Sequence, residues 1–166
     1  MPNQVEIEAK FWEAVKSDRT MMVGLAGVEG GLGQPMTAQL DEEANGDRGG
    51  PIYFFTAKDT DLVQEMGGRH AAVINFASKD HELFAAVEGA LIADNDAATI
   101  DRLWNRFVAA WFEGGRDDPK LQLLRFEPRD AQIWLNEHSV FAGVKLLLGR
   151  DPKADYKDKT AQVRLS

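Results

Sequence analysis

Short apolar runs separated by glycine-rich or charged turns are the feature that most limits what this chain can fold into. The clearest run, residues 51–56, is rich in aromatic and β-branched residues and follows a pair of glycines. Further strand-like runs lie at residues 20–26, 36–40, 71–77, 83–93 and 161–165. Because these runs do not alternate regularly with helical segments, the pattern favours an antiparallel sheet over a doubly wound parallel sheet.

The connections between the runs indicate how such a sheet is arranged. Residues 71–77 and 83–93 flank a turn-like stretch, which predicts an antiparallel hairpin. The second run has enough alanine to form a helix instead, but Val87, Gly89 and the preceding turn favour a strand. Residues 121–126 and 131–135 form either two strands or one bent strand. We therefore expect an α+β fold with a closed or half-closed barrel, because closure removes exposed strand edges.

Capping residues predict two helices in the first half of the chain. Asn3, followed three residues later by Glu6, is typical of a helix N-terminus, and this helix should end near Asp18. A shorter helix, capped by Asp59 or Thr60, should end at the next pair of glycines. Residues 41–50 have no apolar face and are expected to form a surface loop.

A longer helix is predicted after the capping candidates at residues 94–96. Its apolar side chains recur at helical spacing and are followed by a pair of glycines. They are Ile100, Leu103, Trp104, Phe107, Val108 and Trp111. The apolar residues 140–148 predict a further helix.

Composition limits the class of protein. With 166 residues, 44% of them apolar, the chain can form one compact domain spanning residues 1–166. A formal net charge of −8 argues against nucleic acid or an anionic membrane surface as a partner. No apolar run approaches the roughly 20 residues that span a bilayer. The absence of cysteine excludes disulfides and thiolate chemistry, and together with an N-terminus unlike a signal peptide it fits a cytoplasmic protein.

Several common functional motifs are absent from the sequence. There is no phosphate-binding loop ending in Gly-Lys-Ser/Thr, and the glycines of residues 27–33 lack the spacing of a dinucleotide fingerprint. His70, His81 and His138 are dispersed, so no metal site is expected. We find no pattern that indicates a Ser-His-Asp site.

Trp111 is unusual in its placement. It lies in the last turn of the predicted long helix, just before a pair of glycines that allows close approach of another group. The residues alone leave two interpretations open: the indole packs in the core, or it faces a ligand or a second subunit.

The order of several short motifs resembles the general stress protein 26 family, which belongs to the pyridoxamine 5′-phosphate oxidase-like FMN-binding split barrels. The resemblance extends from about residue 5 to residue 136, and residues 137–166 form a C-terminal extension. Its most specific element is Trp-Phe-Glu-Gly-Gly-Arg-Asp-Asp-Pro at residues 111–119. The other elements are Phe-Trp-Glu at 11–13, Gln-Pro-Met-Thr at 34–37 and Tyr-Phe-Phe-Thr at 53–56.

This resemblance implies a homodimer of six-stranded split barrels with FMN in each of two clefts between the subunits. By position in the family motifs, one strand would lie beside the isoalloxazine ring, the next would contact the ring and ribityl chain, and the following turn would bind the phosphate. The aromatic pair at the end of the long helix would reach the flavin site of the neighbouring subunit. The corresponding residues are Gln34, Pro35, Met36 and Thr37; Phe55 and Thr56; Thr60, Asp61 and Leu62; and Trp111 and Phe112.

Two of these positions depart from the family pattern. Gln34 stands where the family usually has arginine, and Leu62 stands where it usually has the phosphate-binding lysine. Each charge-assisted hydrogen bond to a phosphate contributes roughly 1.5–3 kcal/mol, so losing both could weaken FMN binding by several powers of ten. Asp61 would add repulsion, whereas Lys58 or Arg69 could compensate.

The sequence leads to one principal hypothesis and two alternatives. The first is a flavin-binding split-barrel protein of the general stress type that binds FMN or a related flavin, with oxidoreductase activity on an unknown substrate left open. The flavin would supply the redox chemistry, so no acid or base need be visible in the sequence. The alternatives are a non-enzymatic split-barrel dimer that has lost FMN and binds another ligand, and a dimer whose aromatic cleft is only an interface.

Overall fold

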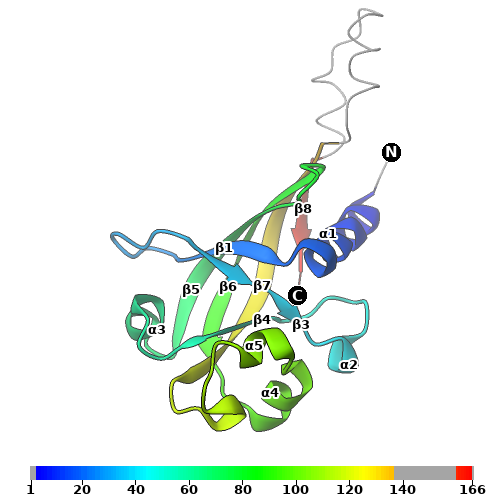
Figure 1. The fold of residues 1–166 in the computed structure, drawn as a ribbon. Coiled ribbons are helices and arrows are strands. Elements are labelled where there is room, and N and C mark those ends of the chain that lie inside the picture. The colour runs from blue at the N-terminus through cyan, green and yellow to red at the C-terminus, as the bar shows by residue number, and fades with distance from the viewer. Residues whose placement is uncertain (1–2, 137–159, 166) are drawn as a thin grey trace, which may run out of the picture.

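The structure is a computed structural model, and it describes residues 3–136 and 160–165. Within these ranges the chain forms an antiparallel split barrel with peripheral helices, which confirms the expected fold class (Figure 1). The strands are β1 (Thr20–Leu25), β2 (Gln34–Thr37), β3 (Gln39–Leu40), β4 (Ile52–Ala57), β5 (Arg69–Ala77), β6 (Leu83–Ala93), β7 (Leu121–Leu135) and β8 (Thr160–Arg164). The helices are α1 (Gln4–Asp18), α2 (Glu42–Asn45), α3 (Asp61–Met66), α4 (Ala97–Leu103), α5 (Arg106–Ala109) and the 3₁₀ turn η1 (Gly115–Asp117).

The barrel is nearly closed because the two ends of the strand path meet in the chain. The order is β2-β1-β5-β6-β7-β4-β3, with β8 paired to β7 outside this path. β2 and β3 are separated only by Ala38, which is buried and donates its N–H to the carbonyl of Arg19 at 2.7 Å. The predicted single strand over 36–40 is therefore two short strands that end opposite edges of the sheet.

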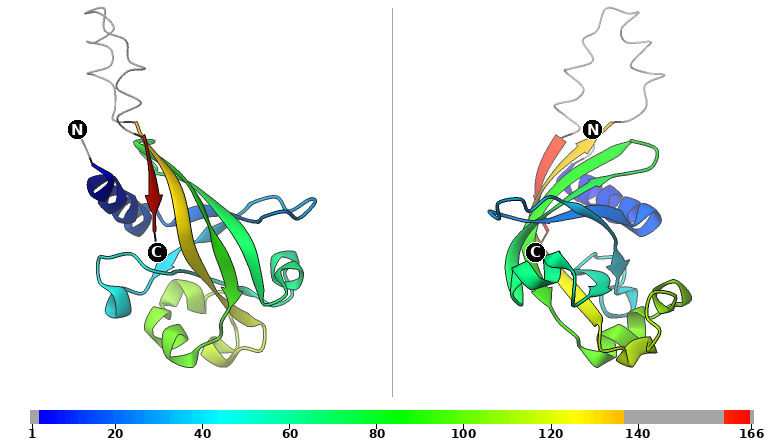
Figure 2. Two further views of the ribbon diagram at one scale, coloured as in Figure 1. Left: turned by 180° about the vertical axis from the view of Figure 1, so that it is seen from behind. Right: turned by 60° about the vertical axis from the view of Figure 1, so that its left-hand side comes forward.

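The barrel core follows from alternating burial along the strands. In β6 every second residue from Leu83 to Leu91 is buried, as expected for a strand with one face on the core. α1 lies beside β8 (Figures 1 and 2) and adds four buried residues, Ile7, Phe11, Trp12 and Val15, to the same hydrophobic cluster.

Residues 121–135 form one bent strand, which settles the alternative left open by the sequence. The register between β6 and β7 shifts at Gly89, which faces Pro128. A Cβ on Gly89 would lie 2.2 Å from the carbonyl oxygen of Glu127, so only glycine fits here. Proline cannot donate to a sheet and is tolerated in an inner strand where such an irregularity interrupts the pairing.

Most local predictions are confirmed. Asn3 and Glu6 form the predicted capping box of α1, and Thr60 caps α3. The hairpin of β5 and β6 is present, and the final strand is β8. The predicted helix over 140–148 lies outside the described residues.

Residues 41–50 are not simply a surface loop. They contain the short helix α2, which is capped by Asp41. Asp41 is only 3% exposed. The prediction failed because the polar composition of this stretch conceals a carboxylate whose partner lies far away in the sequence.

The predicted long helix is also wrong, because the chain breaks between α4 and α5. Trp104 is extended, with ψ of 132°, and so is Asn105. The Asn105 side chain accepts hydrogen bonds from the N–H groups of Phe107 and Val108 at 2.9 and 3.0 Å, so it starts a new helix. The break removes Phe107 and Trp111 from the apolar face, and they are 69% and 84% exposed.

Residues 97–117, here called the helical lobe, pack on a second hydrophobic cluster outside the barrel core. The cluster combines Ile100, Leu103, Val108 and Phe112 of the lobe with residues of β4 and β7. The strand residues are Tyr53, Leu121 and Leu123, and Phe55 and Trp104 pack against them. Among the helices of the described residues, none is long and apolar enough to cross a membrane.

Candidate functional site

A hollow of about 420 Å³ lies between the helical lobe and the edge of the barrel. One wall comes from β2 and Gln39 of β3, the second from the end of β4, and the third from residues 107–112. Its lining residues are Gln34, Pro35, Met36, Thr37, Gln39, Phe55, Thr56, Ala57, Thr60, Phe107, Val108, Trp111 and Phe112. This volume falls in the usual range of small-molecule sites, roughly 300–1,000 Å³.

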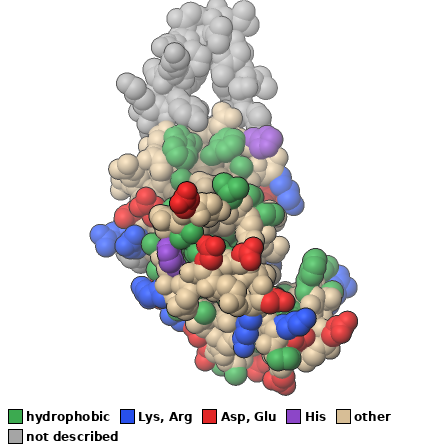
Figure 3. All heavy atoms as spheres, turned by 90° about the vertical axis from the view of Figure 1, so that its left-hand side faces the viewer, with side chains coloured by type: hydrophobic (Ala, Val, Ile, Leu, Met, Phe, Trp, Pro, Cys, Tyr) green, Lys and Arg blue, Asp and Glu red, His purple; other side chains and the backbone are tan. Residues whose placement is uncertain are grey.

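Apolar side chains are exposed at the tip of the helical lobe, with charged side chains around them. Figure 3 shows hydrophobic side chains at the tip of a lobe that stands away from the rest of the molecule. The right panel of Figure 2 shows the backbone of the helical lobe protruding at the lower right. Trp111 and Phe107 are its large exposed hydrophobic residues, and Leu32 and Met22 are also exposed on or near β1.

Nine of the eleven sequence-predicted site residues line this hollow. The two that do not are Asp61 and Leu62. Asp61 is exposed in the first turn of α3, and Leu62 packs against the barrel core. The two predicted strand motifs, Thr60 and the aromatic pair therefore line one hollow, whereas two of the three residues predicted to bind the phosphate do not.

The strand walls are shaped by their places in the sheet. β2 is an edge strand that pairs with β1, and Pro35 is acceptable there because a missing N–H costs little at an edge. In β4, residues 52–54 are buried and residues 55–57 are half-buried, so the strand leaves the core where it reaches the hollow.

The aromatic wall is anchored by ring contacts in the second cluster. Phe55 meets Trp104 edge to face at 6.0 Å between ring centroids, and Trp104 meets Phe112 at 6.3 Å. Such contacts hold flat side chains in defined orientations. Phe112 is buried at the base, whereas Trp111 stands in solvent, so the interpretation of Trp111 as a core residue is excluded.

The motif at residues 111–119 folds into a tight turn that fixes this wall. Gly114 donates its N–H to Asp118 Oδ2 at 3.0 Å, and Lys120 donates to Oδ1 at 2.9 Å. These backbone hydrogen bonds lower the pKa of Asp118. Gly115 adopts a φ of 67°, which favours glycine. The glycines and aspartate of the motif therefore have a structural role in ending the lobe.

The polar groups of the hollow are neutral. Gln34, Thr37, Gln39, Thr56 and Thr60 are its polar lining residues, and the lining includes no charged side chain among the described residues. Thr60 Oγ1 donates to the carbonyl of Ala57 at 2.9 Å. A flat apolar ring with neutral hydrogen-bonding edges fits this set, whereas a phosphate finds no cation in the lining.

The candidate cations do not line the hollow. Lys58 and Arg69 are exposed and do not contribute to its lining. Arg106 lies over the ring of Phe107, with Cζ 4.9 Å from the centroid. This contact was not anticipated from the sequence, because it depends on the helix break at Asn105.

A polar network outside the hollow was also missed. Arg102 of α4 forms an ion pair with the buried Asp41, and the hydrogen bond to that carboxylate raises the pKa of Arg102. Desolvation by burial raises the pKa of Tyr53 in the second cluster. Asp96, one of the capping candidates, caps α4, and the hydroxyl and N–H of Thr99 lower its pKa.

The described residues contain no cluster of histidine, aspartate and glutamate that could hold a metal ion.

Three comparisons place the chain among known proteins. A model of the pyridoxamine 5′-phosphate oxidase-like family matches residues 6–150. General stress protein 26 of Bacillus subtilis is 28% identical over 85 residues, which are 49% of this chain and 60% of that protein. The match thus spans less than two thirds of that relative's length.

Two solved structures share both fold and sequence with the chain. A protein of Xanthomonas campestris pv. campestris, named for the general stress family, is 54% identical with a TM-score of 0.76, covering 84% of this chain and 93% of that one. The general stress FMN/FAD binding protein of Xanthomonas citri is 54% identical with a TM-score of 0.75, covering 82% and 93%.

Proposed function

The chain belongs to the pyridoxamine 5′-phosphate oxidase-like family, and we propose that it binds a flavin, FMN or a close relative, in the hollow beside the helical lobe. One observation carries the proposal. Residues from three segments that lie far apart in the sequence, 34–39, 55–60 and 107–112, together contribute the lining of a single hollow. The FMN/FAD binding relative supports the same class of ligand.

The residues of the hollow suit the two parts of a flavin differently. Phe55, Met36 and Phe112 offer apolar contact to a tricyclic ring, and the amide of Gln34 and the hydroxyl of Thr56 can hydrogen-bond its polar edge. A bound flavin would supply the redox chemistry, whereas these residues would orient its ring and exclude water. The phosphate would be bound without a cation from the lining.

Without such a cation, the hollow should discriminate little between flavins with and without a phosphate. We expect FMN, FAD and riboflavin to bind with affinities within about tenfold of one another, because a phosphate gains its large advantage from charge-assisted hydrogen bonds. Gln34→Arg adds a cation to the hollow and should improve FMN binding more than riboflavin binding.

A homodimer completes the proposal. Trp111 is 84% exposed and Phe107 is 69% exposed, and large aromatic side chains of this kind are enriched where proteins meet partners. A second copy of the chain would cover them and close the open side of the hollow. Sedimentation at micromolar concentration tests this point, and a monomer would contradict it.

Catalysis of an oxidoreductase reaction is the finer part of the proposal. A second candidate function, a non-enzymatic flavin-binding dimer, is favoured by a specific observation. Within the described residues, no titratable side chain lines the hollow that could move a proton. Reduction of the bound flavin by a nicotinamide donor and its reoxidation distinguish the two.

The deciding experiment is a titration of the purified protein with riboflavin, FMN and FAD, in which the quenching of flavin fluorescence measures binding. Trp111→Ala and Met36→Glu should weaken all three flavins, whereas Lys79→Ala, on the remote β5–β6 turn, should change none. The proposal fails when no flavin binds at micromolar concentration to protein that is folded by circular dichroism.

A further inference from the structure

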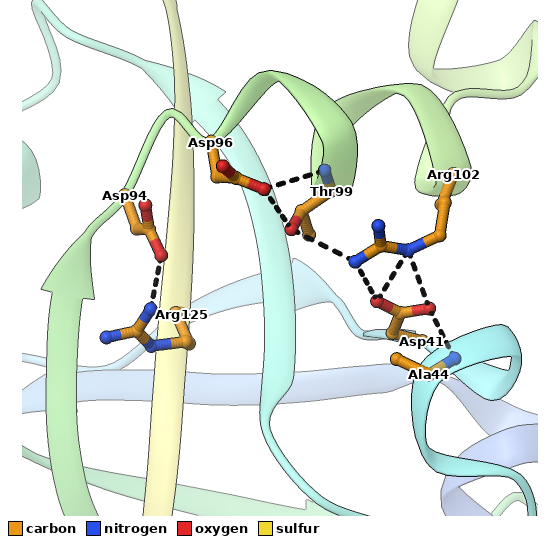
Figure 4. A network of polar contacts seen from close by, with 7 residues as sticks. All are labelled: Asp41, Ala44, Asp94, Asp96, Thr99, Arg102 and Arg125. Atoms are coloured by element: carbon orange, nitrogen blue, oxygen red, sulfur yellow. Dashed lines mark hydrogen bonds and ion pairs between the residues drawn. The ribbon is translucent and has the colours of Figure 1, made fainter.

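An ion pair between a buried carboxylate and a partly exposed guanidinium joins the helical lobe to the strand side of the hollow, although neither partner lines the hollow. Asp41 follows β3 directly, and Arg102 lies in the last turn of α4 (Figure 4). The guanidinium donates to both carboxylate oxygens: Nη2 to Oδ2 at 2.8 Å, and Nε to Oδ2 and Oδ1 at 3.1 and 3.3 Å.

Both partners are fixed by further hydrogen bonds. Asp41 Oδ1 accepts from the N–H of Ala44 at 3.2 Å, which ties the carboxylate to α2. Arg102 Nη2 donates to Thr99 Oγ1 at 3.3 Å, and that hydroxyl donates to Asp96 Oδ2 at 2.7 Å. Figure 4 shows this chain of contacts running from the start of α4 to α2. The planar guanidinium matches the carboxylate with two donors, an arrangement that a lysine cannot reproduce.

The Asp41–Arg102 ion pair connects the lobe to a part of the barrel that the second hydrophobic cluster does not include. The second hydrophobic cluster holds the lobe through residues of β4 and β7, and it contains none from β2 or β3. Gln39 of β3 lines the hollow just before Asp41, and Phe107 begins the opposite wall just after Arg102 and the helix break. The ion pair therefore links α4, which leads into the helical wall, to the residue that follows β3 of the strand wall.

We propose that Asp41 and Arg102 are positioning residues, which set the spacing between the strand wall and the helical wall for the ligand. This inference rests on the proposed flavin site, whose two walls it joins. The Asp41 side chain is 2% exposed and that of Arg102 is 31% exposed. Loss of the guanidinium leaves a buried carboxylate without its partner and removes the hydrogen bonds that join α4 to the residue after β3.

The test compares variants at Arg102 with two matched controls. Arg102→Gln removes the charge, and Arg102→Lys keeps it without the two-point geometry. Arg116→Gln removes an ion pair from the same lobe, with Asp101 at 2.9 Å, whose side chains are half exposed. Ile74→Val removes one methyl group from the barrel core far from the hollow.

Two measurements are made on each full-length variant: amide hydrogen exchange and flavin titration. In Arg102→Gln we expect exchange at residues 105–112 to rise about tenfold relative to β5 and β6, because local opening is governed by the contacts of that segment. We expect flavin affinity to fall about tenfold, with Arg102→Lys intermediate in both. Arg116→Gln should change neither, and Ile74→Val should raise exchange throughout the barrel without changing affinity.

The inference is overturned if exchange at residues 105–112, relative to β5 and β6, is the same in both Arg102 variants as in the wild type. It is also overturned if the Arg102 variants bind flavin no more weakly than Ile74→Val does. Wild-type protein that binds no flavin contradicts the proposed function instead. The exchange measurement still decides whether the ion pair positions the walls, so the two failures are distinguishable. Arg102→Lys provides this answer if Arg102→Gln does not fold.

Discussion

The barrel core and the helical lobe bury similar kinds of side chain but are stabilised in different ways. The barrel core alternates apolar residues along paired strands, so each residue is fixed by the ladder as well as by packing. The lobe rests on seven buried residues, two short helices and a few polar contacts. The proposed ligand hollow therefore combines one wall fixed by the strand ladder with one wall that depends on a small number of side chains.

The largest loss of stability is expected from a substitution in the barrel at Gly89, where the register between β6 and β7 shifts. Gly89→Val should unfold the barrel or cost more than about 3 kcal/mol, because large effects follow from strain or overpacking at a site with no room. Its added Cβ meets the Glu127 carbonyl and lies 2.8 Å from the Phe126 ring. Urea denaturation measures the cost. Gly33→Ala, where a Cβ lies 3.6 Å from its nearest neighbour, is the control and should stay near the wild type.

Truncation of one buried side chain in each hydrophobic cluster tests whether the barrel core and the lobe unfold separately. Phe54→Ala removes a fully buried ring of the barrel core and should cost about 3–5 kcal/mol of global stability. Leu103→Ala, in the second cluster, should cost about 2 kcal/mol or less, because the lobe can open while the barrel stays folded. Denaturation gives the global value, and hydrogen exchange shows whether the Leu103 effect stays within residues 97–112. Uniform exchange after Leu103→Ala would show that the lobe and barrel unfold together.

The two N-caps offer a smaller and more local comparison. Asn3→Ala and Asn105→Ala each remove a side chain that accepts from backbone N–H groups, at a typical cost of about 1 kcal/mol. The loss at Asn3 should lower the stability of the whole domain, since α1 packs on the barrel core. The loss at Asn105 should mainly increase exchange at residues 106–109. Equal global losses in the two variants would contradict the independence of the lobe.

The smallest expected effect is a pH dependence confined to the lobe. Asp96 has a lowered pKa in the folded chain, caused first by the Thr99 hydroxyl and then by its N–H. Its contribution is therefore present above the ordinary carboxyl pKa of 3.8 and is lost as the pH falls through the lower folded value. Amide protection of α4 should fall in this acidic range in the wild type and vary less with pH in Asp96→Asn. An identical pH profile in the two proteins would remove Asp96 as the cause.

Much of the barrel could be predicted because its signals are local. The capping box of Asn3 and Glu6, the β5–β6 hairpin and the strand at β4 each depend on neighbours in the sequence. The site residues on β2 and β4 were found through resemblance to a family, and the structure brings them together.

The lobe was predicted less well because its structure depends on competition between local and distant contacts. Helical spacing from Ile100 to Trp111 indicated one helix, yet Asn105 caps a second helix and turns Phe107 outward. The burial of Asp41 could not be inferred from a polar stretch, because it requires Arg102 from a distant segment. The position of Leu62 was missed for a similar reason, since its partly buried side chain packs against the barrel core and does not line the hollow.

The interruption at Asn105 also bears on how such a protein can diversify. Because α5 starts afresh after the break, its residues face the hollow in an orientation that α4 does not dictate. Substitutions at Phe107, Val108 or Trp111 can therefore alter the shape of that wall while the strand ladder and its register stay as they are. A scaffold with this division can acquire a new ligand preference through one short segment, without a redesign of its sheet.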